Sequence, residues 1–346
     1  MAKDETRVGR HLRRGRESDY GRRSGMPGLK FSIMGDSIST FEGCTPDGYT
    51  LFYNDERLET SGVTSPDDTW WSHVARALGG TILADDAWSG SMVDGAGFPA
   101  AKSPERAAAL LGKNGETPDV VITFIGINDY GWGGAAAQAA GHSHAMPKCI
   151  DPASVPEQVA GAAPADAAEQ FGAAYRTMLH NIRSVAPEAL VYCVTLLPGR
   201  TRSIDHPEFA YRLRGIHLDE YNRAIREAAA AEGARVADVR AFGRDYDSLE
   251  GTHPTNLGMR QFASMVVRAM QLADAEATSG TNDAENAHAT HRGATIGAQP
   301  ESANPALDLQ GFCGAPASAE TCDAPTCIGC PHAANTGNQW LCRCLK

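Results

Sequence analysis

Between residues 28 and 272, short apolar runs alternate with segments in which apolar positions recur at helical spacing. Five of the runs are rich in apolar and β-branched residues, which is typical of parallel strands covered on both faces. The predicted strands are residues 29–34, 81–84, 119–125, 189–197 and 234–239.

The segments between these runs carry the 3.6-residue period of amphipathic helices. Asp68 is the predicted N-cap of the first helix, which ends at Gly79 and Gly80. The four apolar stripes are Trp70, Trp71, Val74 and Leu78; Phe171, Tyr175, Leu179, Ile182 and Val185; Leu218, Tyr221, Ile225 and Ala228; and Phe262, Val266 and Met270. This alternation predicts an α/β fold, a three-layer α/β/α sandwich around a parallel sheet.

In such sheets, functional residues lie on the loops at the carboxyl ends of the strands. Gly35-Asp36-Ser37 follows the first predicted strand, and Trp88-Ser89-Gly90 follows the second. Gly126-Ile127-Asn128-Asp129 follows the third, and Gly251-Thr252-His253-Pro254 precedes the last helix. All four motifs are therefore expected at one edge of the sheet.

These residue types fit acyl transfer. A serine hydroxyl is a weak nucleophile and needs a base, which His253 could supply to Ser37. The tetrahedral intermediate needs donors for its oxyanion, and three are expected: the N–H groups of Ser37 and Gly90 and the side-chain amide of Asn128. Asp36 and Asp129 are expected to brace their loops.

The four motifs, in this chain order, resemble the blocks of the SGNH (GDSL-like) hydrolase family over residues 27–272. Ser37 matches the nucleophile, Gly90 and Asn128 match the block-two glycine and block-three asparagine, and His253 matches the histidine. The resemblance implies a flavodoxin-like sheet of five parallel strands. It also implies hydrolysis of esters, often acyl groups on sugars or lipids, with no metal or other cofactor for catalysis.

One position departs from the family pattern. The family has Asp three residues before the histidine, and this chain has Glu250. Glutamate carries the same charge on a longer side chain and could still orient the imidazole. Asp247 is a second candidate, and a backbone carbonyl in a Ser–His dyad is a third.

The favoured substrate is a small acyl group on a carbohydrate. Trp88, Tyr130 and Trp132 flank the motifs and could stack on a sugar, although rim packing explains them equally well. Lipid esters and thioesters are alternatives with the same mechanism. A different class is a catalytically silent carbohydrate-binding or scaffold protein. The oligomeric state is not predicted.

Charge is uneven along the 346 residues. The net charge is −11, yet residues 1–30 hold nine Lys/Arg against four Asp/Glu. The acidic body argues against nucleic-acid binding. Residues 1–26 are interpreted as a disordered basic leader, and Met26 is an alternative start. The leader has no apolar region like that of a secretory signal, and no run is long enough for a membrane span, so a cytoplasmic location is expected.

Three further regions interrupt or follow the main pattern. Residues 131–165, rich in Ala and Gly, form an insertion that is either a lid or filler, within a hydrolase domain predicted at 27–275. Residues 276–311 are predicted to be a disordered linker and residues 312–346 a Cys-rich tail, which holds six of the nine cysteines.

The spacing of the tail cysteines suits a structural zinc ion. Cys327 and Cys330 form one pair and Cys342 and Cys344 a second, giving four thiolates. A disulfide knot, a modified cargo peptide and an unfolded tail are the alternatives.

Overall fold

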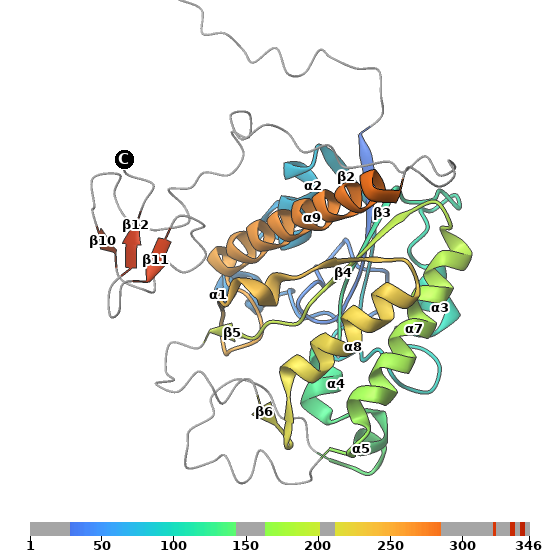
Figure 1. The fold of residues 1–346 in the computed structure, drawn as a ribbon. Coiled ribbons are helices and arrows are strands. Elements are labelled where there is room, and N and C mark those ends of the chain that lie inside the picture. The colour runs from blue at the N-terminus through green and yellow to red at the C-terminus, as the bar shows by residue number, and fades with distance from the viewer. Residues whose placement is uncertain are drawn as a thin grey trace, which may run out of the picture.

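The structure, a computed structural model, describes residues 28–142, 163–200 and 212–284, and short strands at 321–322, 333–335 and 340–342. Its main feature is a five-stranded parallel sheet in the order β2-β1-β3-β4-β8 (Figure 1). The predicted α/β fold and its five strands are confirmed. The strands are β1 (Leu29–Gly35), β2 (Gly80–Ala87), β3 (Val120–Phe124), β4 (Leu190–Val194) and β8 (Arg235–Ala237).

The register of the sheet brings the motif-bearing loops together. Gly35, the last residue of β1, pairs with Ala87 at the end of β2 and with Phe124 at the end of β3. Because the three carboxyl ends are level, the loops that follow them leave the sheet at the same edge.

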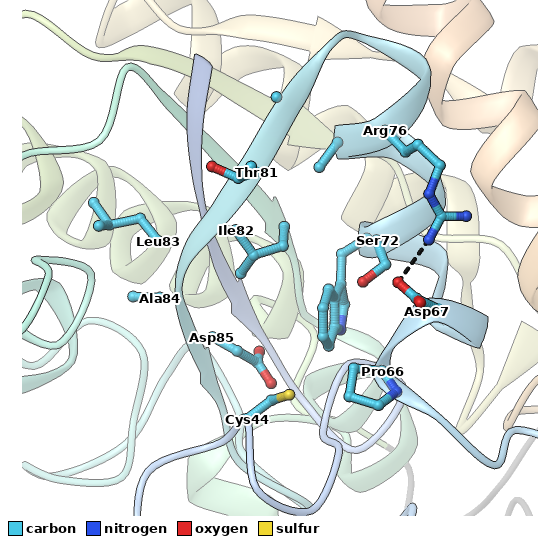
Figure 2. A pocket seen from close by; sticks show the side chains of 13 residues that line it. Cys44, Pro66, Asp67, Ser72, Arg76, Thr81, Ile82, Leu83, Ala84 and Asp85 are labelled. Carbon is cyan, nitrogen blue, oxygen red and sulfur yellow. Dashed lines mark hydrogen bonds and ion pairs between the residues drawn. The ribbon is translucent and has the colours of Figure 1, made fainter. Parts of the chain in front are cut away.

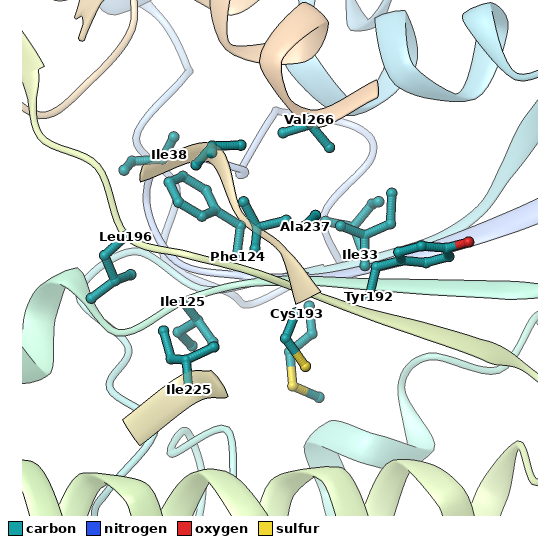
Figure 3. Packing of buried hydrophobic residues seen from close by; sticks show 14 of the residues in the cluster. Ile33, Ile38, Phe124, Ile125, Tyr192, Cys193, Leu196, Ile225, Ala237 and Val266 are labelled. Atoms are coloured by element: carbon teal, nitrogen blue, oxygen red, sulfur yellow. The ribbon is translucent and has the colours of Figure 1, made fainter. Parts of the chain in front are cut away.

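Helices cover both faces of the sheet (Figure 1). On one face α2 (Trp70–Ala77) packs against α9 (Asn256–Ala284), and on the other α7 (Ala167–Val185) packs against α8 (Leu218–Ala231) and α3 (Pro104–Ala108). Figure 3 shows both interfaces, with Val266 of α9 on one side of the sheet and Ile225 of α8 on the other. The four predicted apolar stripes are therefore confirmed as core faces.

The cap of α2 differs from the prediction. Thr69, not Asp68, is the N-cap, and its hydroxyl accepts a hydrogen bond from the Ser72 N–H. Asp68 instead accepts the Ser65 N–H and completes the capping box of η2 (Pro66–Asp68). Asp68 therefore belongs to η2 and caps that short helix, so it does not cap α2.

The last helix is longer than the sequence pattern indicates. It continues to Ala284, into the segment predicted as a disordered linker from residue 276. Residues 271–277 (Gln-Leu-Ala-Asp-Ala-Glu-Ala) are mostly of high helix propensity, so the helix continues past Met270, the last residue of the predicted apolar stripe, and beyond residue 275. The predicted domain end at 275 therefore falls inside a helix.

Shorter elements line the edges of the domain. α4 (Ile127–Trp132) runs into the predicted insertion at 131–165, which also holds α5 (Ala135–Ala139), and residues 143–162 lie outside the described part. The remaining elements are α1 (Glu56–Ser61), η5 (Val239–Phe242) and the paired two-residue strands β5 (Gly199–Arg200) with β9 (Tyr246–Asp247) and β6 (Arg212–Leu213) with β7 (Ile216–His217).

The tail forms a small antiparallel sheet in the order β10-β12-β11, with β10 (Thr321–Cys322), β11 (Ala333–Asn335) and β12 (Trp340–Cys342). Cys327, Cys330 and Cys344, like the predicted leader at 1–26, lie outside the described residues. The zinc site remains a prediction. No helix in the described part is long and apolar enough to cross a membrane.

Candidate active site

Ser37 lies in a tight turn directly after β1. The Ser39 N–H donates to the Asp36 carbonyl at 3.0 Å, and the Ile38 N–H donates to Asp36 Oδ1 at 3.1 Å. The Asp36 carboxyl is buried, and the loss of hydration raises its pKa to about 7. Asp36 thus braces the turn, as the sequence analysis predicted.

His253 lies on a loop between β9 and α9 that is closed by its own hydrogen bonds. The Leu249 N–H donates to the His253 carbonyl at 2.9 Å. Two buried tyrosines hold the outside of the loop: Tyr246 donates to the Thr252 carbonyl at 2.7 Å and Tyr53 to the Pro254 carbonyl at 2.8 Å. The imidazole therefore projects from a rigid support.

The turn and the loop bring three side chains into one hydrogen-bonded chain. His253 Nε2 lies 2.8 Å from Ser37 Oγ, and His253 Nδ1 is hydrogen bonded to Glu250 Oε1. The same oxygen of Glu250 accepts the His253 N–H at 3.3 Å. Ser37 and His253 are each 6% exposed, so these hydrogen-bonded side chains are screened from bulk water but still reach the surface.

Asp247, the second candidate for orienting the histidine, is engaged elsewhere. Its Oδ2 accepts a hydrogen bond from the Thr255 hydroxyl at 2.5 Å, and its N–H donates to Gln261 Oε1 at 2.8 Å. Of the candidates that the sequence left open, Glu250 is the one whose carboxylate reaches the imidazole.

The expected oxyanion donors lie on the neighbouring loops. Gly90 has φ +81°, a conformation that favours glycine, and a Cβ built there would meet no atom within 4 Å. The N–H groups of Ser37 and Gly90 donate to no acceptor in the described part of the chain. Asn128, at the start of α4, donates one amide hydrogen to the Ser91 carbonyl at 2.9 Å, and its second amide hydrogen is left for another acceptor.

A buried carboxyl joins the second and third loops. Asp129 accepts the Val93 N–H on Oδ2 at 2.8 Å and the Asp94 N–H on Oδ1 at 3.0 Å. Burial raises its pKa to about 7, and the two peptide donors oppose that shift. Asp129 thus braces the loops, as the sequence suggested.

Arg106 is a structural residue of the site that sequence reasoning missed. Its fully buried guanidinium forms an ion pair with Asp86 at 2.8 Å and donates to Ser91 Oγ at 2.7 Å. It also donates to the Gly35 carbonyl at 3.1 Å and the Pro99 carbonyl at 2.6 Å. One side chain therefore connects the ends of β1 and β2 to the loop that carries Gly90.

Two residues beside the histidine were also missed. The Phe52 ring stacks on the imidazole of His253, with the ring centroids 3.4 Å apart and the planes 4° from parallel. The guanidinium carbon of Arg57 lies 4.7 Å from the Phe52 centroid. Neither residue belongs to a recognisable motif. The Phe52–His253 contact joins segments some 200 residues apart, so no local pattern indicates it.

The three aromatic residues proposed for substrate contact have different environments. Trp88 is partly exposed and packs edge-on against Phe98, with centroids 4.9 Å apart, and against Tyr49 at 4.6 Å. Tyr130 is a core residue, 1% exposed and packed against a second tyrosine of the interior, so its predicted substrate contact does not fit its position. Trp132 is partly buried at the end of α4.

A pocket of about 500 Å³ lies away from this chain of residues, beside the edge strand β2. Figure 2 shows its lining from β2 and α2, with the exposed Arg76–Asp67 ion pair on one side and Cys44 beside Asp85 on another. Neither Ser37 nor His253 lines it. The pocket is therefore separate from the candidate active site.

The sequence places this chain in a known class. The family model for GDSL-like lipases and acylhydrolases matches residues 33–261. The chain therefore belongs to the GDSL-like lipase/acylhydrolase family, a family of hydrolases, as the four motifs predicted. No curated protein matches the chain.

Several solved structures are similar to this chain. A protein from Bacteroides uniformis, described as a GDSL-like lipase, is 21% identical, with a TM-score of 0.44 over 70% of this chain and 94% of its own. A carbohydrate esterase family 2 enzyme from Corynascus thermopiles is 19% identical, with a TM-score of 0.43 over 71% of this chain and 67% of its own. A family two carbohydrate esterase from Clostridium thermocellum is 16% identical, with a TM-score of 0.39 over 70% and 63%. These identities are too low to transfer a substrate.

Proposed function

We propose that this chain is a serine esterase that hydrolyses carboxylic esters through an acyl-enzyme at Ser37. The observation that carries the proposal is the continuous hydrogen-bonded chain from Glu250 through His253 to Ser37, with Nε2 2.8 Å from Oγ. This is the arrangement by which a base activates a serine hydroxyl.

The hydrogen bonds of the two ring nitrogens determine which of them carries the proton. Nδ1 carries the hydrogen and donates it to Glu250, which leaves Nε2 as an acceptor for the Ser37 hydroxyl. As Oγ forms a bond to the acyl carbon, Nε2 takes its proton and Glu250 stabilises the imidazolium. The imidazolium then gives that proton to the leaving alcohol as the tetrahedral intermediate collapses.

Water completes the cycle in the reverse sense. His253 takes a proton from water, the hydroxide attacks the acyl carbon, and Ser37 leaves with the proton returned from Nε2. In both steps the negative oxygen of the intermediate is proposed to bind the Ser37 and Gly90 N–H groups and the free amide hydrogen of Asn128.

A small acyl group on a carbohydrate is the favoured substrate. The aromatic group of Tyr49, Trp88 and Phe98 supports this choice, because it adjoins the Gly90 loop and Phe98 is 43% exposed. Exposed aromatic faces can stack on the apolar faces of sugars. Lipid esters and thioesters would use the same serine chemistry, and an acyl-substrate panel separates the three classes.

Labelling of the nucleophile tests the proposal. Purified full-length protein is incubated with a fluorophosphonate probe and, separately, with p-nitrophenyl acetate. We expect the probe to label the wild type and both signals to fall to background in Ser37→Ala, with Ser39→Ala, a nearby serine whose hydroxyl contacts the Trp70 indole, still labelled. A wild type that the probe does not label would favour a catalytically silent carbohydrate-binding or scaffold protein.

A further inference from the structure

The stack of Phe52 on His253 restricts the motion of the base. The two rings are 4° from parallel with centroids 3.4 Å apart, which is van der Waals contact over the whole ring. Rotation of the imidazole about its Cβ–Cγ bond would drive one ring edge into the phenyl ring. The contact therefore holds Nε2 in the direction of Ser37 Oγ.

The backbone on either side of Phe52 is fixed to both halves of the site. The Phe52 N–H donates to Thr40 Oγ1 at 2.9 Å, and the same hydroxyl donates to the Ser37 carbonyl at 3.0 Å. The next residue, Tyr53, donates to the carbonyl of Pro254, directly after the histidine. The segment 52–53 thus sets the position of the nucleophile turn relative to the histidine loop.

Arg57 completes a three-layer stack. Its guanidinium lies 4.7 Å from the Phe52 centroid, and because the imidazole occupies one face of the phenyl ring, the guanidinium covers the other. A guanidinium on an aromatic face is attracted by the ring quadrupole. This attraction favours the orientation in which Phe52 stacks on the imidazole. Arg57 is also a permanent positive charge near the site where an imidazolium forms.

Four other titratable groups lie near the imidazole or its support. Glu250 lies on its own loop, Asp36 adjoins Ser37, Tyr53 follows Phe52, and Tyr246 lies beneath the loop. Glu250 and an ionised Asp36 favour the imidazolium. Arg57, behind Phe52, is a cation and opposes it.

We propose that Phe52 is a positioning residue for the proposed general base His253, and that Arg57, stacked behind it, holds Phe52 in place and lowers the basicity of the imidazole. The inference rests on the proposed esterase function, and neither residue is proposed to touch the reacting atoms. Phe52 governs the geometry of the base, and Arg57 governs the pH at which it works.

The first arm of the test replaces the ring. We expect Phe52→Leu to lower kcat for p-nitrophenyl acetate about 10–100-fold, the scale of loss that follows a misplaced catalytic group, with KM changed less than threefold. Phe52→Tyr keeps the stack and should retain kcat within threefold. Melting temperatures of both variants report whether the fold is intact.

The second arm replaces the charge. In Arg57→Met the apparent pKa of the acidic limb of kcat/KM should rise by about 0.3–0.5 pH unit at low ionic strength, because a repulsive cation is lost. The shift should shrink in 0.5 M salt, and Arg57→Lys should keep most of the wild-type profile. Arg268→Met, an exposed arginine of α9, is the matched control and should leave the profile unchanged.

The outcomes separate the inference from the proposed function. Unlabelled, inactive wild-type protein would remove the esterase proposal itself. An active wild type whose kcat is unchanged in folded Phe52→Leu, or whose acidic limb is unchanged in Arg57→Met, would overturn the corresponding role while the esterase proposal stands. Should Phe52→Leu not fold, Phe52→Met, which has a flexible side chain and no ring face, takes its place and should show the same loss of kcat, and an unchanged kcat in folded Phe52→Met would overturn the role of Phe52.

Discussion

Glu250 is one methylene longer than the aspartate that the family pattern has in this place, and the loop accommodates the difference. Its Oε1 meets both Nδ1 and the main-chain N–H of His253. A carboxylate that accepts both hydrogen bonds fixes the imidazole of His253 relative to the backbone of His253, whatever the length of the acidic side chain. A longer side chain at residue 250 is therefore compatible with the same tautomer.

Replacement of Glu250 by its neutral isostere measures that contribution. We expect Glu250→Gln to lower kcat about 10²–10⁴-fold, because the imidazolium loses its counter-charge and the tautomer is no longer enforced. Steady-state kinetics at pH 7–8 check this, and Asp247→Asn, whose partner is Thr255, should change kcat much less. Equal losses in the two variants would show that the carboxylates act through the loop and not through the imidazole.

The side chain of Asn128 gives a second prediction at this scale. One of its amide hydrogens is used by the Ser91 carbonyl at 2.9 Å, which aims the other. We expect Asn128→Ala to lower kcat about 10²–10³-fold with little change in KM, the usual effect of removing one oxyanion donor. An unchanged kcat would remove Asn128 from the proposed oxyanion hole.

At the scale of the elements, a buried ion pair joins α3 to the edge strand β2. Asp86 is the next-to-last residue of β2 and Arg106 belongs to α3, and both side chains are fully buried. Burial raises the pKa of Asp86 to about 6, although the guanidinium of Arg106 opposes the shift. The pair thus connects the edge strand to the loop that carries Gly90. Its attraction offsets only part of the free energy that Asp86 loses when its carboxylate is removed from water.

Removal of the arginine should be severe. We expect Arg106→Met to lower the free energy of unfolding by about 3–5 kcal/mol, because Asp86 remains buried without its partner. Without the guanidinium the pKa of Asp86 rises further, so the loss should be larger at pH 8 than at pH 5. Urea denaturation at both values checks this. The double variant Asp86→Asn/Arg106→Met should recover part of the loss, and no recovery would mean that the lost peptide contacts dominate.

The elements also separate local signals, which the sequence carries, from contacts that depend on packing. Strands, helices and the four motifs were predictable because hydrophobic period and turn residues are local signals. Ser37 and Asn128 could be placed at one edge because each directly follows a predicted strand, and His253 because it precedes the last helix and matches the family's histidine. Arg106 and Phe52 could not, because their partners, such as Gly35 and His253, lie far away in the sequence and depend on the exact packing.

At the scale of the whole molecule, the interior holds several carboxyl groups whose ionisation is disfavoured by burial. Asp36 and Asp129 are buried with pKa values raised to about 7, and Asp86 has a pKa of about 6. In the unfolded chain each would titrate near 4. The folded protein therefore binds more protons than the unfolded chain between about pH 4 and 7.

This difference fixes the sign of the pH dependence. Because the folded-state pKa values are raised, the stabilisation is complete below about pH 4 and is lost as the pH rises through 6–7. The net charge of −11 adds repulsion in the same direction. We expect the free energy of unfolding, measured in urea, to fall between pH 5 and 7 and then to level off.

Asp129→Asn isolates one of these groups. The variant lacks the titrating carboxyl, so its stability should fall less steeply between pH 5 and 7, by up to about 1.4 kcal/mol per pH unit. It should also be less stable at pH 5 by about 1–3 kcal/mol, because a single amide oxygen cannot accept both the Val93 and Asp94 N–H groups. The two stability curves should therefore converge as the pH rises. Parallel curves would mean that Asp129 is already ionised at pH 5, held in that state by the two peptide donors.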